Sequence, residues 1–133
     1  MIKVHGRKSE IKNYQTAFAF LEGRQRRKLV NNTWLEVRDG ETIAVRYHKT
    51  DVVTYKADGK IILNSGGWQT VTTKERLNAF SPLGVYQRRG VWLVSRYLGD
   101  GVHDEIALFK DGATFEYLGD GLKMRVCDPA LSL

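Results

Sequence analysis

The residues best suited to chemistry in this chain lie between Asn64 and Asn78, where the sequence runs Asn-Ser-Gly-Gly-Trp-Gln-Thr-Val-Thr-Thr-Lys-Glu-Arg-Leu-Asn. This pattern is typical of a strand end, a glycine turn and the start of a short helix, with Thr72 and Glu75 spaced as a capping box. A helix start offers free N–H groups and the positive end of the helix dipole, which together favour an anion. The candidate phosphate-binding residues are Thr70, Thr72, Thr73, Lys74, Arg76, Trp68, Arg46 and His48.

A purely structural interpretation of the same segment also stands. Threonine hydroxyls at a helix start are good caps, and a glycine pair often only makes a turn. The segment matches neither the Walker pattern nor the GxGxxG pattern, so it carries no established nucleotide fingerprint.

A second candidate site is the basic stretch formed by Arg24, Arg26, Arg27 and Lys28. The formal net charge of +6 lies wholly in the first 30 residues, because the other 103 carry 13 basic and 13 acidic side chains. Such asymmetry predicts a polyanionic partner, with nucleic acid first. The alternative is a solvated edge strand, where Lys and Arg discourage pairing with other chains.

Evidence for catalysis is weaker. His48 and Asp51 lie close in sequence, and a His–Asp pair can orient a general base, although an aspartate after a strand more often hydrogen-bonds its own turn. His5, His48 and His103 show no metal-binding spacing, and Cys127 is the only cysteine. We therefore expect no metal site, no cofactor and no internal disulfide.

The three tryptophans differ in their surroundings. Trp34 and Trp92 lie in apolar strand patterns, which is typical of core residues. Trp68 follows the glycine pair and is the aromatic residue most readily placed against a ligand, with packing under the helix as the alternative.

Turn signals divide the chain into short alternating segments. Asp-Gly and similar dipeptides predict four hairpins, because these residues tolerate positive φ. The paired segments are Trp34–Arg38 with Thr42–His48, Val52–Lys56 with Lys60–Leu63, Val85–Arg88 with Val91–Val94, and Ile106–Phe109 with Ala113–Tyr117.

The remaining elements complete the predicted fold. Arg24–Val30 suits a basic edge strand, Leu122–Val126 suits a last strand, and Tyr14–Leu21 fits either a strand or a helix. One helix is expected from about Thr73 to Phe80, ended by a Ser-Pro pair. The predicted class is mainly β (α+β): an antiparallel, partly closed sheet of hairpins with one short helix.

Length and composition limit the number of domains that the chain can form. With 133 residues and 42% hydrophobic residues, the chain fits one β-rich domain over 13–127, a loose N-terminal arm over 1–12 and a C-terminal tail over 128–133. No apolar run approaches the ~20 residues of a membrane helix, and the N-terminus lacks a secretory signal core. We therefore expect a cytoplasmic protein without membrane contact.

Three stretches resemble a family of small bacteriophage proteins. They are Arg27-Lys-Leu-Val-Asn-Asn-Thr-Trp-Leu35, Ile43-Ala-Val-Arg-Tyr-His-Lys-Thr-Asp-Val-Val-Thr54 and Leu63-Asn-Ser-Gly-Gly-Trp-Gln-Thr-Val-Thr-Thr-Lys-Glu-Arg-Leu-Asn78, within residues 23–95. The resemblance implies a phage context, in which small proteins act on host machinery, phage nucleic acid or a host defence signal. It implies no catalytic residue.

These observations leave three functional hypotheses. The first is a phage binding protein for a phosphate-bearing ligand, with nucleic acid as the main candidate. The second is a counter-defence protein that sequesters a small (cyclic) nucleotide immune signal, and the third is a small hydrolase. A host protein and a second copy of the chain remain open as partners.

Overall fold

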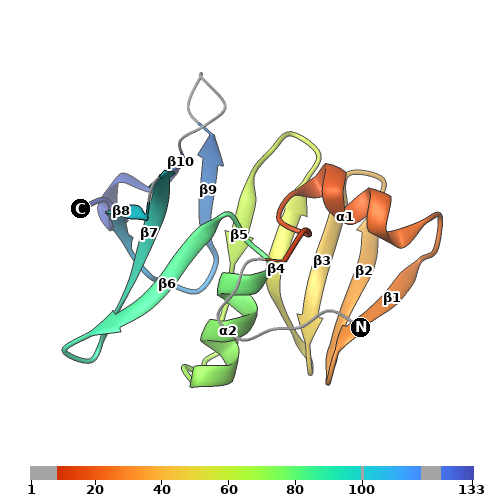
Figure 1. Ribbon diagram of the computed structural model, residues 1–133, viewed down its shortest axis with the longest axis horizontal. Helices are drawn as coiled ribbons and strands as arrows, with labels where there is room; N and C mark the ends of the chain where they lie inside the picture. The colour runs from red at the N-terminus through yellow and green to blue at the C-terminus, as the bar shows by residue number, and fades with distance from the viewer. Residues whose placement is uncertain (1–8, 100, 118–123) are drawn as a thin grey trace.

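The structure, a computed structural model, describes residues 9–99, 101–117 and 124–133. The elements in chain order are α1 (Tyr14–Leu21), β1 (Arg26–Val30), β2 (Thr33–Asp39), β3 (Thr42–Tyr47), β4 (Thr50–Lys56), β5 (Ile61–Leu63), α2 (Val71–Ala79), β6 (Leu83–Arg88), β7 (Val91–Gly99), β8 (Val102–Leu108), β9 (Ala113–Tyr117), β10 (Met124–Val126) and a 3₁₀ turn (Pro129–Leu131). Figure 1 shows their arrangement.

The strands form two antiparallel sheets. Sheet A has seven strands in the order β1-β2-β3-β4-β5-β9-β10, and sheet B has three in the order β6-β7-β8. The predicted antiparallel, mainly β class is confirmed. Neither sheet closes on itself within the described residues, and the described chain has two α-helices where one was expected.

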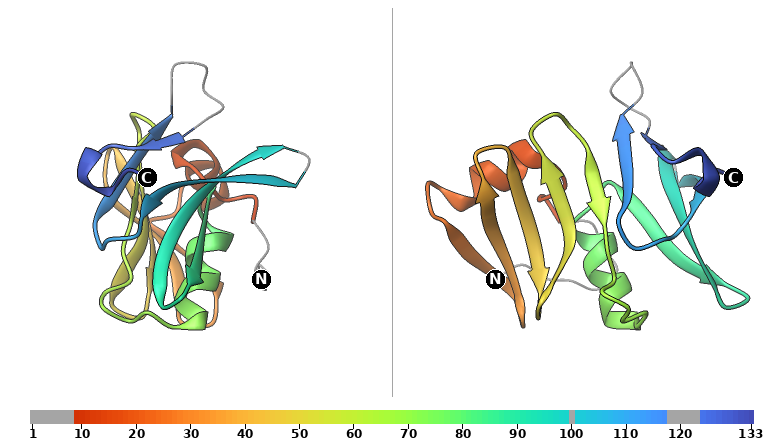
Figure 2. Two further views of the ribbon diagram at one scale, coloured as in Figure 1. Left: turned by 90° about the vertical axis from the view of Figure 1, so that its left-hand side faces the viewer. Right: turned by 180° about the vertical axis from the view of Figure 1, so that it is seen from behind.

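Both helices lie on the same face of sheet A. Leu35, Val45 and Val53 stand in register on β2, β3 and β4, and all three are buried on the inner face. Seen from behind, in the right panel of Figure 2, the strands β1 to β5 lie in front of α1, and no described helix covers this outer face. Arg46 and Glu36, which alternate with the buried residues, therefore face outward.

The core fills the space between the inner face of sheet A, the helices and sheet B. Its largest fully buried side chains are Tyr55, Phe80, Phe115, Ile11, Leu29 and Leu35. The hydroxyl of Tyr55 donates to the backbone carbonyl of Phe80, so the one polar group of this buried side chain has a hydrogen-bond partner. Burial raises the pKa of Tyr55 well above its ordinary value.

Three of the four predicted hairpins are confirmed: β2–β3, β4–β5 and β6–β7. The fourth was wrong, because β8 pairs with β7 in sheet B whereas β9 pairs with β5 in sheet A. The Asp111-Gly112 turn thus joins two sheets. It is fixed by long-range contacts, since the amide of Gly112 donates to the carbonyl of Leu63 at 2.8 Å.

Side-chain caps explain where the helices begin. Asn13 and Thr16 cap α1 reciprocally, because each side chain accepts a hydrogen bond from the other residue's backbone amide. Helix α2 begins at Val71, and its cap is Thr70, whose hydroxyl accepts from the amide of Thr73. The predicted capping box of Thr72 and Glu75 was therefore wrong by two residues.

The two ends of the chain are described in part. Residues 1–8 of the predicted N-terminal arm lie outside the described residues, as do the first two residues of the strand predicted over 122–126. At the C-terminus, Ser132 forms a bridge with Ala107 of β8. In the described ranges, no helix has the length and apolar character needed to cross a membrane.

Candidate functional site

A pocket of about 390 Å³ lies between the β3–β4 turn, the segment after β5 and the first turn of α2. Its lining residues are Tyr47, His48, Lys49, Thr50, Ser65, Trp68, Thr70 and Thr73. Four of the predicted phosphate-site residues therefore meet here: His48, Trp68, Thr70 and Thr73. Four others, Arg46, Thr72, Lys74 and Arg76, do not line the pocket.

The glycine segment beside the pocket is held by a carboxylate from the β8–β9 turn. Asp111 accepts from the amide and the hydroxyl of Ser65, both at 2.7 Å, and from the amide of Gly67 at 3.2 Å. Gly66 has a φ of 64°, and a Cβ there would collide with the side chain of Thr50. The amide donors of Ser65 and Gly67, which a phosphate could otherwise use, are thus occupied by the protein's own anion.

The hydroxyls of Thr70 and Thr73 are also engaged with each other and the helix. The Oγ1 atom of Thr70 accepts from the amide of Thr73 at 3.2 Å and lies 3.1 Å from its Oγ1. This geometry stabilises the first turn of α2 and gives the pocket a fixed polar wall.

Arg76 is a structural residue of α2. Its side chain is buried, its Nε donates to the hydroxyl of Thr33 at 3.1 Å, and its Nη2 donates to the carbonyl of Asn31 at 3.2 Å. The guanidinium carbon lies 5.1 Å from the ring centroid of Tyr47. Arg76 therefore ties α2 to the β1–β2 turn and supports one pocket wall from behind.

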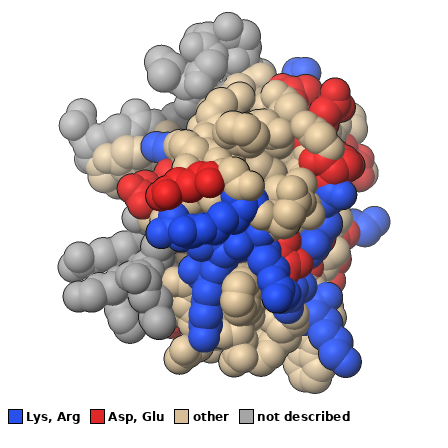
Figure 3. All heavy atoms as spheres, turned by 90° about the vertical axis from the view of Figure 1, so that its right-hand side faces the viewer, with Lys and Arg blue, Asp and Glu red and all other residues tan. Residues whose placement is uncertain are grey.

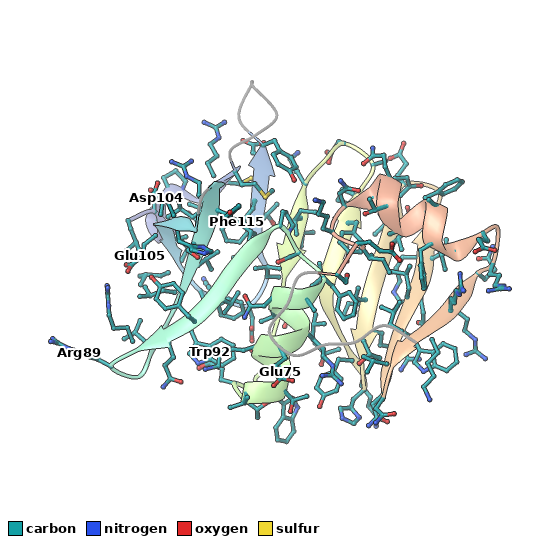
Figure 4. The ribbon with its side chains drawn as sticks, viewed as in Figure 1. Glu75, Arg89, Trp92, Asp104, Glu105 and Phe115 are labelled. Carbon is teal, nitrogen blue, oxygen red and sulfur yellow. The ribbon has the colours of Figure 1, made fainter. Side chains whose placement is uncertain are left out.

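Lys74 faces sheet B. Its Nζ lies 5.4 Å from the ring centroid of Trp92, which Figure 4 shows beside α2. The charge of Lys74 is thus directed at an aromatic ring of β7 and away from the pocket lining. Trp92 is buried, as its apolar strand pattern predicts.

A charged cluster on the outer face of sheet A engages Arg46 and Asp51. Glu36 accepts from Arg46 at 2.7 and 3.0 Å and from Arg38 at 2.9 Å, while Arg38 also binds both carboxylate oxygens of Asp51. The hydrogen bonds from Arg46, followed by those from Arg38, lower the pKa of Glu36 to about 2. The cluster is therefore ionised and internally neutralised at ordinary pH.

The candidate pair of His48 and Asp51 does not form, because Asp51 belongs to this charged cluster and His48 does not. The ring of His48 contacts Tyr47, with centroids 4.4 Å apart, whereas the carboxylate of Asp51 is engaged by Arg38. The described side chains show no hydrogen bond between His48 and Asp51. Elsewhere in the described chain, no group of three or more His, Cys, Asp or Glu residues is placed to hold a metal ion.

The second predicted site is an exposed strip on the edge strand β1. Arg24, Arg26 and Lys28, hereafter the basic strip, are exposed beside or on this strand, and Figure 3 shows Lys and Arg gathered on this side of the molecule. Arg26 lies over Trp34, with its guanidinium carbon 5.2 Å from the ring centroid. The expectation that Trp34 is a core residue was therefore wrong, because it is only half-buried on the outer face of sheet A. Within the described residues, Arg24 and Lys28 have neither a hydrogen bond from the side chain nor an ion pair.

Arg27 points to the other face of β1. Its Nη1 donates to the carbonyl of Phe20 at 2.7 Å and to Glu22 at 3.2 Å, and its guanidinium lies over the ring of Phe20. Arg27 therefore joins the end of α1 to β1, and we leave it out of the basic strip.

Sequence patterns missed four pocket residues: Tyr47, Lys49, Thr50 and Ser65. Lys49 follows His48 directly, so extending the candidate site along its turn finds it. Thr50 and Ser65 meet the pocket only because the β3–β4 turn packs against the glycine segment, and no local pattern records that contact.

The fold and these surfaces define a small antiparallel β protein with an open basic edge and a pocket at one end of its larger sheet. The chain belongs to a family of bacteriophage proteins, since the family model described as Kyanoviridae Gp96 protein matches residues 7–116. The resemblance to small phage proteins is thus confirmed and extends beyond the stretches that first indicated it. No curated protein and no solved structure matches the chain.

Proposed function

We propose that this phage protein binds nucleic acid through the basic strip. The observation that supports the proposal is the state of its three cations: Arg24 and Lys28 have no carboxylate partner in the described structure, and Arg26 lies over Trp34. Cations that the protein does not neutralise itself remain available to phosphates, and their binding releases counterions from the nucleic acid.

The form of the surface also suits this ligand. Arg26 and Lys28 are two residues apart on one strand, so their side chains share the outer face with Trp34. An aromatic ring beside unpaired cations is the combination that proteins use to bind single strands, with bases on the ring and phosphates on the cations. Arg38 and Arg46 lie nearby but are already neutralised by Glu36 and Asp51, so they add less.

The test compares two triple variants that remove the same charge. Arg24→Ala/Arg26→Ala/Lys28→Ala removes the basic strip, and Lys60→Ala/Arg89→Ala/Lys110→Ala removes three cations elsewhere. Binding to short single-stranded and duplex DNA and RNA is measured by fluorescence anisotropy between about 50 and 200 mM salt. We expect the strip variant to bind about 100-fold more weakly at low salt, since an exposed charge pair contributes up to about 1 kcal/mol and three are lost.

The salt series gives a second readout. Loss of three phosphate contacts should reduce the slope of log affinity against log salt by about 2–3. The control variant should keep most of the affinity. Absence of binding by the wild-type protein at low salt, or equal losses in both variants, would contradict the proposal.

Capture of a small nucleotide, as a counter-defence protein would require, is the second candidate function. The pocket favours it, because His48 and Trp68 line one pocket beside Lys49. A compact pocket changes its affinity less with salt than an extended basic surface does. The same salt series therefore separates the two functions.

A further inference from the structure

We infer that the pocket at the start of α2 binds a nucleobase, which stacks on Trp68 and places its phosphate near Lys49. This inference deepens the proposed function and shares its ligand class. Either a nucleic-acid strand or a free nucleotide can supply such a base, and the experiment below distinguishes the two sources.

Trp68 is an exposed ring on a fixed backbone. Trp68 is 70% exposed, whereas tryptophans usually bury most of their surface. Its amide donates to the carbonyl of Ser65 at 3.1 Å, and its carbonyl accepts from the amide of Thr70 at 3.0 Å. The main chain at Trp68 is thus fixed beside the pocket, and the exposed ring leaves apolar surface free for stacking.

The chemistry of the lining fits a planar, anionic ligand. Tyr47 and His48 contribute aromatic surface, while Thr50 contributes a hydroxyl that can bond the polar edge of a base. No aspartate or glutamate is among the lining residues, and Lys49 has no partner among the described residues. The volume of about 390 Å³ falls within the range of sites for small ligands.

The turns that line the pocket are hydrogen-bonded to the strands that carry the basic strip. Lys28, Trp34 and Arg46 stand opposite one another on β1, β2 and β3, and Arg46 donates to the carbonyl of His48 at 2.5 Å. The amide of His48 also donates to the carbonyl of Asn32 in the β1–β2 turn at 2.9 Å. A strand bound along the basic strip reaches the pocket only by passing around the β1–β2 and β3–β4 turns, from the outer face of sheet A to the side of α2.

The experiment uses the full chain and four probes: the nucleoside monophosphates, ribose 5-phosphate, inorganic phosphate and a short single-stranded oligonucleotide. Backbone amide shifts by NMR report whether Trp68 and Thr70 respond, and titration gives affinities for wild type, Trp68→Ala and Lys49→Ala. Phe18→Ala is the matched control, because Phe18 is another aromatic residue, 63% exposed, on α1. Thermal melts verify that each variant is folded.

We expect the base-bearing probes to shift the Trp68 and Thr70 amides, and ribose 5-phosphate and phosphate to leave them unchanged. Trp68→Ala should weaken binding about fivefold to 100-fold, which corresponds to the loss of one base stack, while Phe18→Ala should have no effect. Lys49→Ala should weaken binding of the nucleoside monophosphates, because it removes the cation near their phosphate.

The source of the base is identified by the probe whose affinity falls in Trp68→Ala. A loss of affinity for the oligonucleotide indicates a base of a bound strand, and a loss for a monophosphate alone indicates a free nucleotide. If wild type binds no strand yet a monophosphate shifts Trp68, the proposed function fails and this inference stands. Wild-type affinity of Trp68→Ala for every probe, or no shift at the pocket with any of them, would overturn it.

Discussion

The cations of β1 and those of α2 look alike in sequence but lie in opposite environments. On β1 and its approach, Arg24, Arg26 and Lys28 are exposed and without acidic partners in the described structure. On α2, Arg76 is buried among polar partners and Lys74 lies against Trp92. Both groups were predicted to bind phosphate, yet only the first leaves its charges available.

The difference shows that charge counts alone do not locate an anion site. A guanidinium that already donates to the hydroxyl of Thr33 and the carbonyl of Asn31 must break those bonds before it can bind a phosphate. An exposed, unpaired guanidinium gives up only water and counterions. We therefore expect Arg76 to stabilise the fold and the basic strip to bind the ligand, and each expectation can be tested separately.

The largest effect on stability is expected for Arg76→Ala. The change removes two hydrogen bonds and the contact with Tyr47 from a site that is 7% exposed, and it leaves a cavity between α2 and the β1–β2 turn. We expect the free energy of unfolding to fall by about 3 kcal/mol, measured by urea denaturation.

Arg24→Ala is the matched control for that measurement. It removes the same side chain from an exposed position, so its effect on the free energy of unfolding should stay within about 0.5 kcal/mol. Equal stability of Arg76→Ala and wild type would show that the buried guanidinium is not the structural tie described above.

Glu36→Gln is the next largest test, because it leaves Arg46 without a carboxylate partner while Arg38 keeps Asp51. The folded pKa of Glu36, about 2, lies below its ordinary value of 4.5, so its stabilising contribution is complete above about pH 5 and is lost as the pH falls toward 2. We expect Glu36→Gln to lower the free energy of unfolding at neutral pH by about 2 kcal/mol, and the difference from wild type to vanish near pH 2.

The same variant should bind nucleic acid more tightly than wild type, because Arg46 and Arg38 lose one neutralising carboxylate. Urea denaturation across the pH range and anisotropy at neutral pH are the two measurements. A difference in stability that persists unchanged to pH 2 would show that the ionised form of Glu36 is not responsible.

Local sequence signals predicted most of the strands. Alternation and two-residue turns place β2–β3, β4–β5 and β6–β7 correctly, because the hairpin is decided by residues adjacent in the chain. The Asp111-Gly112 turn carries the same signal, but Asp111 bonds Ser65 and Gly67, so a contact across 46 residues places β9 beside β5. A local pattern does not record such a contact.

The candidate site was predicted in part for the same reason. Trp68, Thr70 and Thr73 are neighbours along the chain, and the helix-start pattern finds them together. Their partners across the pocket, Thr50 and Tyr47, arrive from another hairpin through tertiary packing. Arg76 faces the core because the β1–β2 turn supplies its hydrogen-bond partners, and that turn lies next to Arg76 only in the folded structure.

The smallest expected effect, from Lys74, sharpens the comparison most directly. Its contact with Trp92 is a half-buried cation–π contact, so Lys74→Gln should lower the free energy of unfolding by about 0.5–1 kcal/mol. Because Lys74 does not line the pocket, neither Lys74→Gln nor the charge reversal Lys74→Glu should change the affinity for a nucleotide or a strand at equal salt by more than about twofold. An anion bound at the first turn of α2 predicts the reverse, with Lys74→Glu clearly weaker than Lys74→Gln, since a repelling charge would then lie at the anion. Titration beside thermal melts of both variants decides between these outcomes, and a marked loss of affinity in Lys74→Glu alone would return the start of α2 to the phosphate-binding surface.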